Sequence, residues 1–96
     1  MKEYSTIQVQ DLLGEGLNLI DVREAHEVAQ GKIPGAVNIP LGLLEFRMNE
    51  LERPKEYIIV CRSGARSAQA TDFLESHGFT VINMSGGMLT WEGPIE

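Results

Sequence analysis

Short runs of β-branched and other apolar residues recur along the chain and are separated by more polar segments. The runs most typical of buried strands are 17–22, 36–38, 57–60 and 79–84. The segments between them end in glycine or carry apolar residues at helical spacing; they are 24–29, 41–51 and 66–78. Because strands alternate with helices over so short a length, the pattern predicts an α/β fold with a small, mostly parallel sheet of about four or five strands flanked by helices.

Local signals define both ends of several of the expected helices. Ser5 followed by Gln8 is a capping-box pattern that opens a first helix, which we expect to reach Leu13 before the glycines that follow. Gly78 is placed to end the helix that begins at Arg66. A short closing helix is expected over 88–91.

Composition limits the classes of protein that the chain can belong to. A length of 96 residues predicts one domain, 1–96, and a hydrophobic content of 43% is that of an ordinary globular protein. The net charge of -6 argues against nucleic acid or an anionic membrane as a partner. With no signal peptide and no apolar run of membrane-spanning length, we expect a cytoplasmic protein.

The chain has one cysteine, Cys61, at the carboxyl end of the strand 57–60. A loop of four residues, Arg62 to Ala65, separates it from Arg66 and the next helix. In an open α/β sheet this is the usual position of a ligand site. Loop amides, the positive end of the helix dipole and the two arginines are all able to stabilise a thiolate. The pattern therefore predicts a nucleophilic cysteine with a lowered pKa.

Two alternatives follow from the residues themselves. A lone cysteine is often an inert core residue, but arginines in its loop make little sense for core packing. Asp21, at the end of the strand 17–22, is expected at the same sheet edge as Cys61. In one alternative, its carboxylate pairs with a loop arginine or accepts hydrogen bonds from loop amides. In the other, it caps the helix 24–29.

No metal and no organic cofactor are expected. His26 and His77 are distant from each other in the sequence and have no other metal-ligating residues beside them.

The segment Cys61-Arg62-Ser63-Gly64-Ala65-Arg66-Ser67 resembles the active-site loop of the rhodanese family of sulfurtransferases. Further segments fit that family in the right order over nearly the whole chain. They are Ile20-Asp21-Val22-Arg23-Glu24, Gly31-Lys32-Ile33-Pro34-Gly35-Ala36, Asn38-Ile39-Pro40, and Gly86-Gly87-Met88 with Trp91. One departure stands out: Lys32 occupies the position where the family commonly has histidine, so no general-base role carries over to it.

The resemblance implies a thiosulfate:cyanide sulfurtransferase. Cys61 would take sulfur from thiosulfate or a similar small anionic donor, hold it as a persulfide, and pass it to cyanide or a thiol, including a protein thiol. The binding residues would be Arg62, Ser63, Gly64, Ala65 and Arg66, with Asp21 and Arg23 in support. The turn at Gly86 and Gly87 would lie close to the loop, with Trp91 helping to hold it. We expect a monomer.

Two other functions are compatible with the same loop. Rhodanese-related phosphatases and arsenate reductases also use a Cys-to-Arg loop, but the phosphatases place one residue more between the cysteine and the arginine. The other alternative is a non-catalytic domain that only binds a partner, as in relatives that have lost the cysteine. The presence of Cys61 weighs against this second alternative.

Overall fold

A computed structural model describes residues 1–96 and contains a five-stranded parallel sheet. The strands are β1 Glu3–Tyr4, β2 Asn18–Asp21, β3 Val37–Asn38, β4 Glu56–Val60 and β5 Thr80–Met84. Their order is β1-β5-β4-β2-β3, which places β4 at the centre. The predicted α/β fold is confirmed. The edge strand β1 was not predicted, because two residues carry no recognisable strand pattern.

Four α-helices and three 3-10 helices connect the strands. The α-helices are α1 Thr6–Leu12, α2 Ala25–Val28, α3 Leu44–Arg47 and α4 Ala65–Ser76; the 3-10 helices are η1 Leu41–Leu43, η2 Met48–Glu50 and η3 Gly87–Thr90. The capping box at Ser5 is present, and Gly78 follows α4 with a positive φ of 86°. None of the helices combines the length and the apolar character needed to cross a bilayer.

The segment 41–51 differs from the single helix that its apolar spacing predicts. It forms η1, α3 and η2 in succession, with the backbone at Leu43 and Arg47 close to ψ of zero, at -2° and 0°. Leu44 is the one residue of these three elements that is fully buried, so the core anchors a single turn. Gly42 and Asn49 are poor helix formers, which favours the tighter turns on either side.

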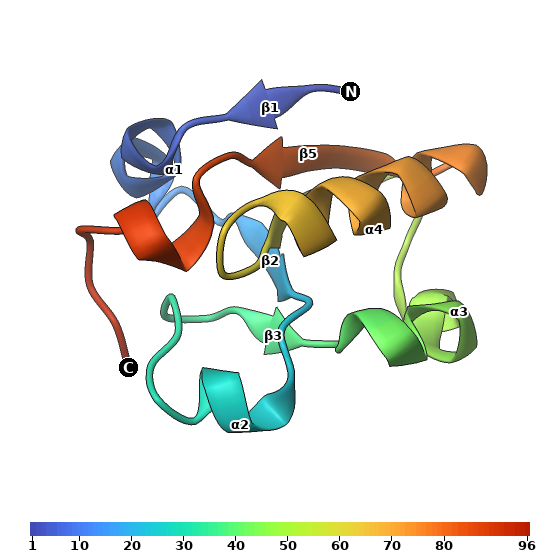
Figure 1. Cartoon of the computed structure of the whole chain (residues 1–96). Helices are drawn as coiled ribbons and strands as arrows, with labels where there is room; N and C mark the ends of the chain where they lie inside the picture. The colour runs from blue at the N-terminus through green and yellow to red at the C-terminus, as the bar shows by residue number, and fades with distance from the viewer.

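Successive side chains of β4 point to opposite faces of the sheet, and this divides the core into two layers. Tyr57, Ile59 and Cys61 belong to the cluster that α4 covers through Ala70 and Leu74. The intervening residues Ile58 and Val60 belong to a second cluster on the other face, which includes Val9 of α1. Figure 1 shows α4 lying along the sheet with a loop at its amino end, and this loop is the connection from β4. The side chain of Cys61 therefore projects beneath the first turn of α4.

Candidate active site

Cys61 is the first residue after β4, and its sulfur lies inside the loop that leads into α4. Gly64 turns this loop with a φ of +102° and serves as the N-cap of α4. Its backbone N–H donates to Cys61 Sγ at 3.0 Å, and Ser67 Oγ lies 3.2 Å from the same sulfur. The Cys61 side chain is fully buried. The sulfur therefore lies at the amino end of a helix, where the Gly64 N–H donates to it and the Ser67 hydroxyl contacts it.

Two opposing effects act on the pKa of the Cys61 thiol. Burial raises this pKa, but hydrogen bonds from Ser67 and from the loop amides of Gly64 and Ser63 outweigh it, so that the pKa falls below its ordinary value. The Ser67 hydroxyl makes the largest lowering contribution. The sequence predicted a lowered pKa for Cys61, and the structure agrees with that direction. The main cause of the lowering is Ser67, in the first turn of α4, and neither of the two arginines.

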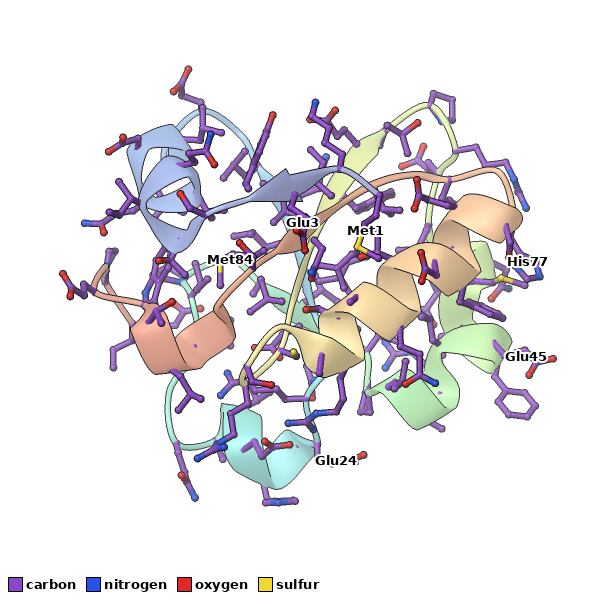
Figure 2. The ribbon with its side chains drawn as sticks, turned by 45° about the horizontal axis from the view of Figure 1, so that its top comes forward. Met1, Glu3, Glu24, Glu45, His77 and Met84 are labelled. Atoms are coloured by element: carbon purple, nitrogen blue, oxygen red, sulfur yellow. The ribbon has the colours of Figure 1, made fainter.

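The two loop arginines are in different surroundings. The Arg66 guanidinium binds the Glu27 carboxylate through two hydrogen bonds of 2.6 and 2.8 Å. This pair joins the first turn of α4 to α2 and holds the pKa of Glu27 at about 2. Figure 2 shows Glu24, the N-cap of α2, near the amino end of α4, and His77 at the far end. Arg62 is exposed, and its side chain makes no hydrogen bond or ion pair.

Asp21 is at the sheet edge where it was expected, but neither predicted role for its carboxylate is correct. It accepts the Arg23 guanidinium at 2.7 Å and the Arg23 backbone N–H at 3.1 Å. Glu24 is the N-cap of α2 instead. The reason is the pleat: Asp21 is in register with Val60, so its side chain points to the face opposite that of Cys61. Arg23 also donates to the Gly31 carbonyl at 2.9 Å and so ties down the segment after α2.

The turn after β5 supports the loop from behind through its backbone. The N–H groups of Met88 and Leu89 donate to the carbonyls of Cys61 and Arg62, both at 2.9 Å. A Cβ atom on Gly87 would lie 2.4 Å from the Arg62 carbonyl oxygen, so only glycine permits this approach. Trp91 follows η3 and packs against the second core cluster.

A surface cavity of about 330 Å³ lies beside the loop. Its charged residues are Arg23, Glu27 and Arg62. Its apolar residues are Met88, Leu89, Trp91 and Ile95. Because Arg62 is the one cavity cation without a carboxylate partner, an anionic group entering the cavity would meet it first.

With this geometry established, comparison with known proteins identifies the class. The profile of the family described as "Rhodanese-like domain" matches residues 5–94. A Bacillus subtilis protein named "Putative sulfurtransferase YtwF" is 45% identical over 98 residues, covering 100% of this chain and 95% of its own length. The human protein named "Thiosulfate:glutathione sulfurtransferase" is 34% identical, covering 88% of this chain and 87% of its own length.

A solved structure agrees with the sequence comparisons. The crystal structure of a rhodanese-like domain protein from Staphylococcus aureus superposes with a TM-score of 0.95 at 34% identity, covering 100% of this chain and 97% of that one. The chain belongs to the rhodanese-like domain family. The names of its relatives support sulfur transfer as its activity.

Two residues of the site were not singled out from the sequence. Ser67 is the last residue of the loop motif and was given no role, although its position three residues after the helix-capping Gly64 is the signal that could have revealed one. Glu27 lies 39 residues from Arg66, and no local pattern links the two. Of the predicted loop residues, Gly64 and Ser63 direct their backbone N–H groups at the sulfur, and the binding roles of Arg62 to Arg66 stay predictions.

We expect Ser67→Ala to raise the pKa of Cys61, because it removes the hydroxyl that contributes most to stabilising the thiolate. Iodoacetamide alkylation against pH measures this directly, since the chain has no second thiol. The unmodified protein should show an inflection below the free-thiol value of about 8.5. Ser76→Ala, at the exposed end of the same helix, is the control. An inflection at or above the free-thiol value in the unmodified protein would support the inert-core interpretation.

We expect Glu27→Gln to lower the free energy of unfolding at pH 7 by about 1 kcal/mol, the upper end for a partly exposed pair. The pKa of Glu27 is lowered from 4.5 to about 2 on folding, so its contribution is present above pH 4.5 and is lost as the pH falls toward 2. Urea denaturation at pH 7 and pH 3 should show the difference between variant and parent shrinking in acid. Glu50→Gln, in an exposed pair with Arg47, is the matched control. A difference that grows on acidification would contradict the assignment.

Proposed function

We propose that the protein transfers sulfane sulfur through a persulfide on Cys61. The observation that carries this proposal is the sulfur itself: it accepts a loop N–H at 3.0 Å, contacts the Ser67 hydroxyl, and has a lowered pKa at the amino end of α4. These features favour the thiolate, which is the nucleophilic form of cysteine. The relatives named as sulfurtransferases support the same chemistry.

The first half of the reaction loads the enzyme. The Cys61 thiolate attacks the outer sulfur of thiosulfate, a new S–S bond forms, and the S–S bond of the donor breaks. Sulfite leaves with the electron pair of that bond, and Cys61 carries a persulfide anion. Arg62, which is exposed and unpaired, attracts the anionic donor to the loop. The loop amides then stabilise the negative charge on the persulfide in the way that an oxyanion hole stabilises oxygen.

The second half of the reaction releases the sulfur. A nucleophilic acceptor attacks the outer sulfur of the persulfide, and the Cys61 thiolate is regenerated as the leaving group. Cyanide gives thiocyanate, and a thiolate gives a new persulfide on the acceptor. We propose that the acceptor in a cell is a thiol, that the donor is a small anion, and that the enzyme is a monomer.

The position of Arg66 favours sulfur transfer over the phosphatase alternative. Phosphoryl chemistry in a Cys-to-Arg loop needs several donors converging on a tetrahedral anion at about 2.7–3.1 Å. Four residues separate Cys61 from Arg66, which gives a smaller ring of amides than the loop of the related phosphatases. The Arg66 guanidinium is in addition bound on two atoms by Glu27, so it is not free to complete that ring.

We expect Cys61 to be the sole sulfur carrier, because the chain has no other thiol. Incubation with thiosulfate followed by intact-mass analysis should show the gain of one sulfur atom. Cys61→Ser should abolish both this gain and thiocyanate formation. Ser76→Ala, which keeps the thiol and lies at the far end of α4, is a control that should still gain the sulfur. Turnover by Cys61→Ser at a rate comparable to that of the parent would rule out the mechanism.

We expect the protein to form thiocyanate and to release no phosphate from an aryl phosphate, because its loop is too short for a tetrahedral anion. Parallel assays with thiosulfate plus cyanide and with the aryl phosphate measure this preference. Insertion of one residue after Gly64 should shift the preference toward phosphate if ring size is the cause. Cys61-dependent phosphate release that exceeds thiocyanate formation in the parent would overturn the proposal.

A further inference from the structure

Asn83, in β5, carries a buried amide close to the loop of Cys61. It is in register with Ile59 of β4, and only 1% of it is exposed. Residues in register on neighbouring strands face the same side of a sheet, so Asn83 points toward α4, as Ile59 and Cys61 do. A polar side chain in this apolar layer needs hydrogen-bond partners.

Both partners of the Asn83 amide are acceptors. Its Nδ2 atom donates to Glu3 Oε2 at 2.9 Å and to the Gly64 carbonyl at 3.4 Å. Figure 2 shows Glu3 between β1 and α4. Because a carboxylate and a carbonyl only accept, the NH2 group must face them, and the amide oxygen must face away. Asn83 Oδ1 is accordingly buried without a partner. The fold leaves this oxygen unpaired and keeps one N–H group aimed at Gly64.

The Gly64 carbonyl has more donors within reach than it has lone pairs. The Ala68 N–H donates to it at 3.0 Å, as the first backbone bond of α4, and the Ser67 hydroxyl donates at 3.1 Å. A carbonyl oxygen has two lone pairs, and these two donors fill them. The Asn83 N–H is a third donor at 3.4 Å, so it makes only a weak bond while Ser67 donates.

The Ser67 hydroxyl has one proton and cannot donate to the carbonyl and to a thiolate at the same time. Ser67 Oγ lies 3.1 Å from the Gly64 oxygen and 3.2 Å from Cys61 Sγ. When Cys61 is a thiol, the hydroxyl donates to the carbonyl and accepts from the S–H group. When Cys61 is a thiolate, the hydroxyl must turn toward the sulfur, which frees one lone pair of the Gly64 oxygen. The Asn83 N–H is the donor beside that oxygen.

We propose that Asn83 is a positioning residue for the reacting cysteine: its amide takes over the Gly64 carbonyl when the Ser67 hydroxyl turns to the Cys61 thiolate. Glu3 orients this amide from the edge strand β1. The inference rests on the proposed function, in which the thiolate is the form that attacks the donor.

The exchange of donors leaves the charges around the loop unchanged. These charged groups come from β1, α2, the loop and α4, and the variants used below retain all of them; they are Glu3, Glu24, Glu27, Arg62 and Arg66. A change in the titration of Cys61 in these variants therefore reports on hydrogen bonds.

Nuclear magnetic resonance can follow the exchange in the parent protein, without a variant of Asn83. As the pH rises through the pKa of Cys61, one side-chain N–H proton of Asn83 should move downfield, because its bond to the Gly64 oxygen shortens. The displacement should vanish in Ser67→Ala, in which the thiolate still forms but no hydroxyl turns. Asn18 is the internal control, since its amide donates to the Glu56 carbonyl at the other end of the sheet.

Either of two results would overturn the inference. The first is an Asn83 proton that does not move as Cys61 ionises. The second is a displacement of the same size in Ser67→Ala, which would trace it to the charge of the thiolate alone.

A double-mutant cycle tests the same coupling by iodoacetamide alkylation of Cys61 against pH. Asn83→Leu should lower the ratio of thiolate to thiol about threefold, the effect of one neutral hydrogen bond. It should have no further effect in the Ser67→Ala background, where no hydroxyl competes for the carbonyl. Asn18→Leu is the matched control. Equal effects of Asn83→Leu in both backgrounds would show that Asn83 only shapes the loop, and would overturn the inference.

These measurements use no sulfur donor, so their outcome is separate from that of the proposed function. Coupling between Asn83 and Ser67 in a protein that gains no sulfur from thiosulfate would support the inference and overturn sulfur transfer. Sulfur gained on Cys61 without this coupling would overturn the inference and leave sulfur transfer standing.

Discussion

The hydrogen bonds to the buried Cys61 sulfur are the interaction on which the rest of the site depends. Burial alone disfavours a thiolate, and a sulfur with no exposed surface could not be activated without donors aimed at it. The donors come from the chain immediately after the cysteine, so the loop must reverse within four residues. Gly64 makes this possible with its positive φ, and Gly87 lets the turn after β5 approach the loop closely enough to hold it. Two glycines on separate segments thus fix the geometry of one sulfur atom.

Carboxylates decide which positive charges are available at this edge of the sheet. Arg23 is occupied by Asp21, and Arg66 is occupied by Glu27, each through more than one hydrogen bond. Arg62 is left without such a partner on the wall of the cavity. In a chain of net charge -6, one free guanidinium at the mouth of the loop is a local attraction for anions that the overall charge opposes. In the proposed sulfur transfer, Arg62 is the single point that attracts the anion, which suits a small donor better than a phosphate that needs several donors.

The sequence was sufficient to predict the strands β2 to β5 and the helices α1, α2 and α4, because the alternation of apolar and polar segments and the glycines that end helices are local signals. It was also sufficient to place Cys61 at the carboxyl edge of the sheet. The roles given to Asp21 were wrong because they used only its position along the strand, and the face to which a side chain points depends on register. Register with Val60 is a property of the assembled sheet. The partnership of Glu27 with Arg66 is of the same kind, since only the assembled fold brings residues 39 positions apart within hydrogen-bond distance.

The Cys61 sulfur and the cavity wall are held in place by contacts with different residues. The sulfur depends on residues 61–67 and on the backbone of 87–89, where a side chain at Gly87 is excluded by steric contact. The cavity wall depends on the exposed ion pair that Lys32 makes with Glu96, the residue after Ile95, and on side chains such as Leu89 and Ile95, both 60% exposed. Exposed positions tolerate substitution with little effect on stability. The cavity wall can therefore vary through residues such as Leu89 and Ile95 without disturbing the hydrogen bond that the Gly64 N–H donates to the Cys61 sulfur.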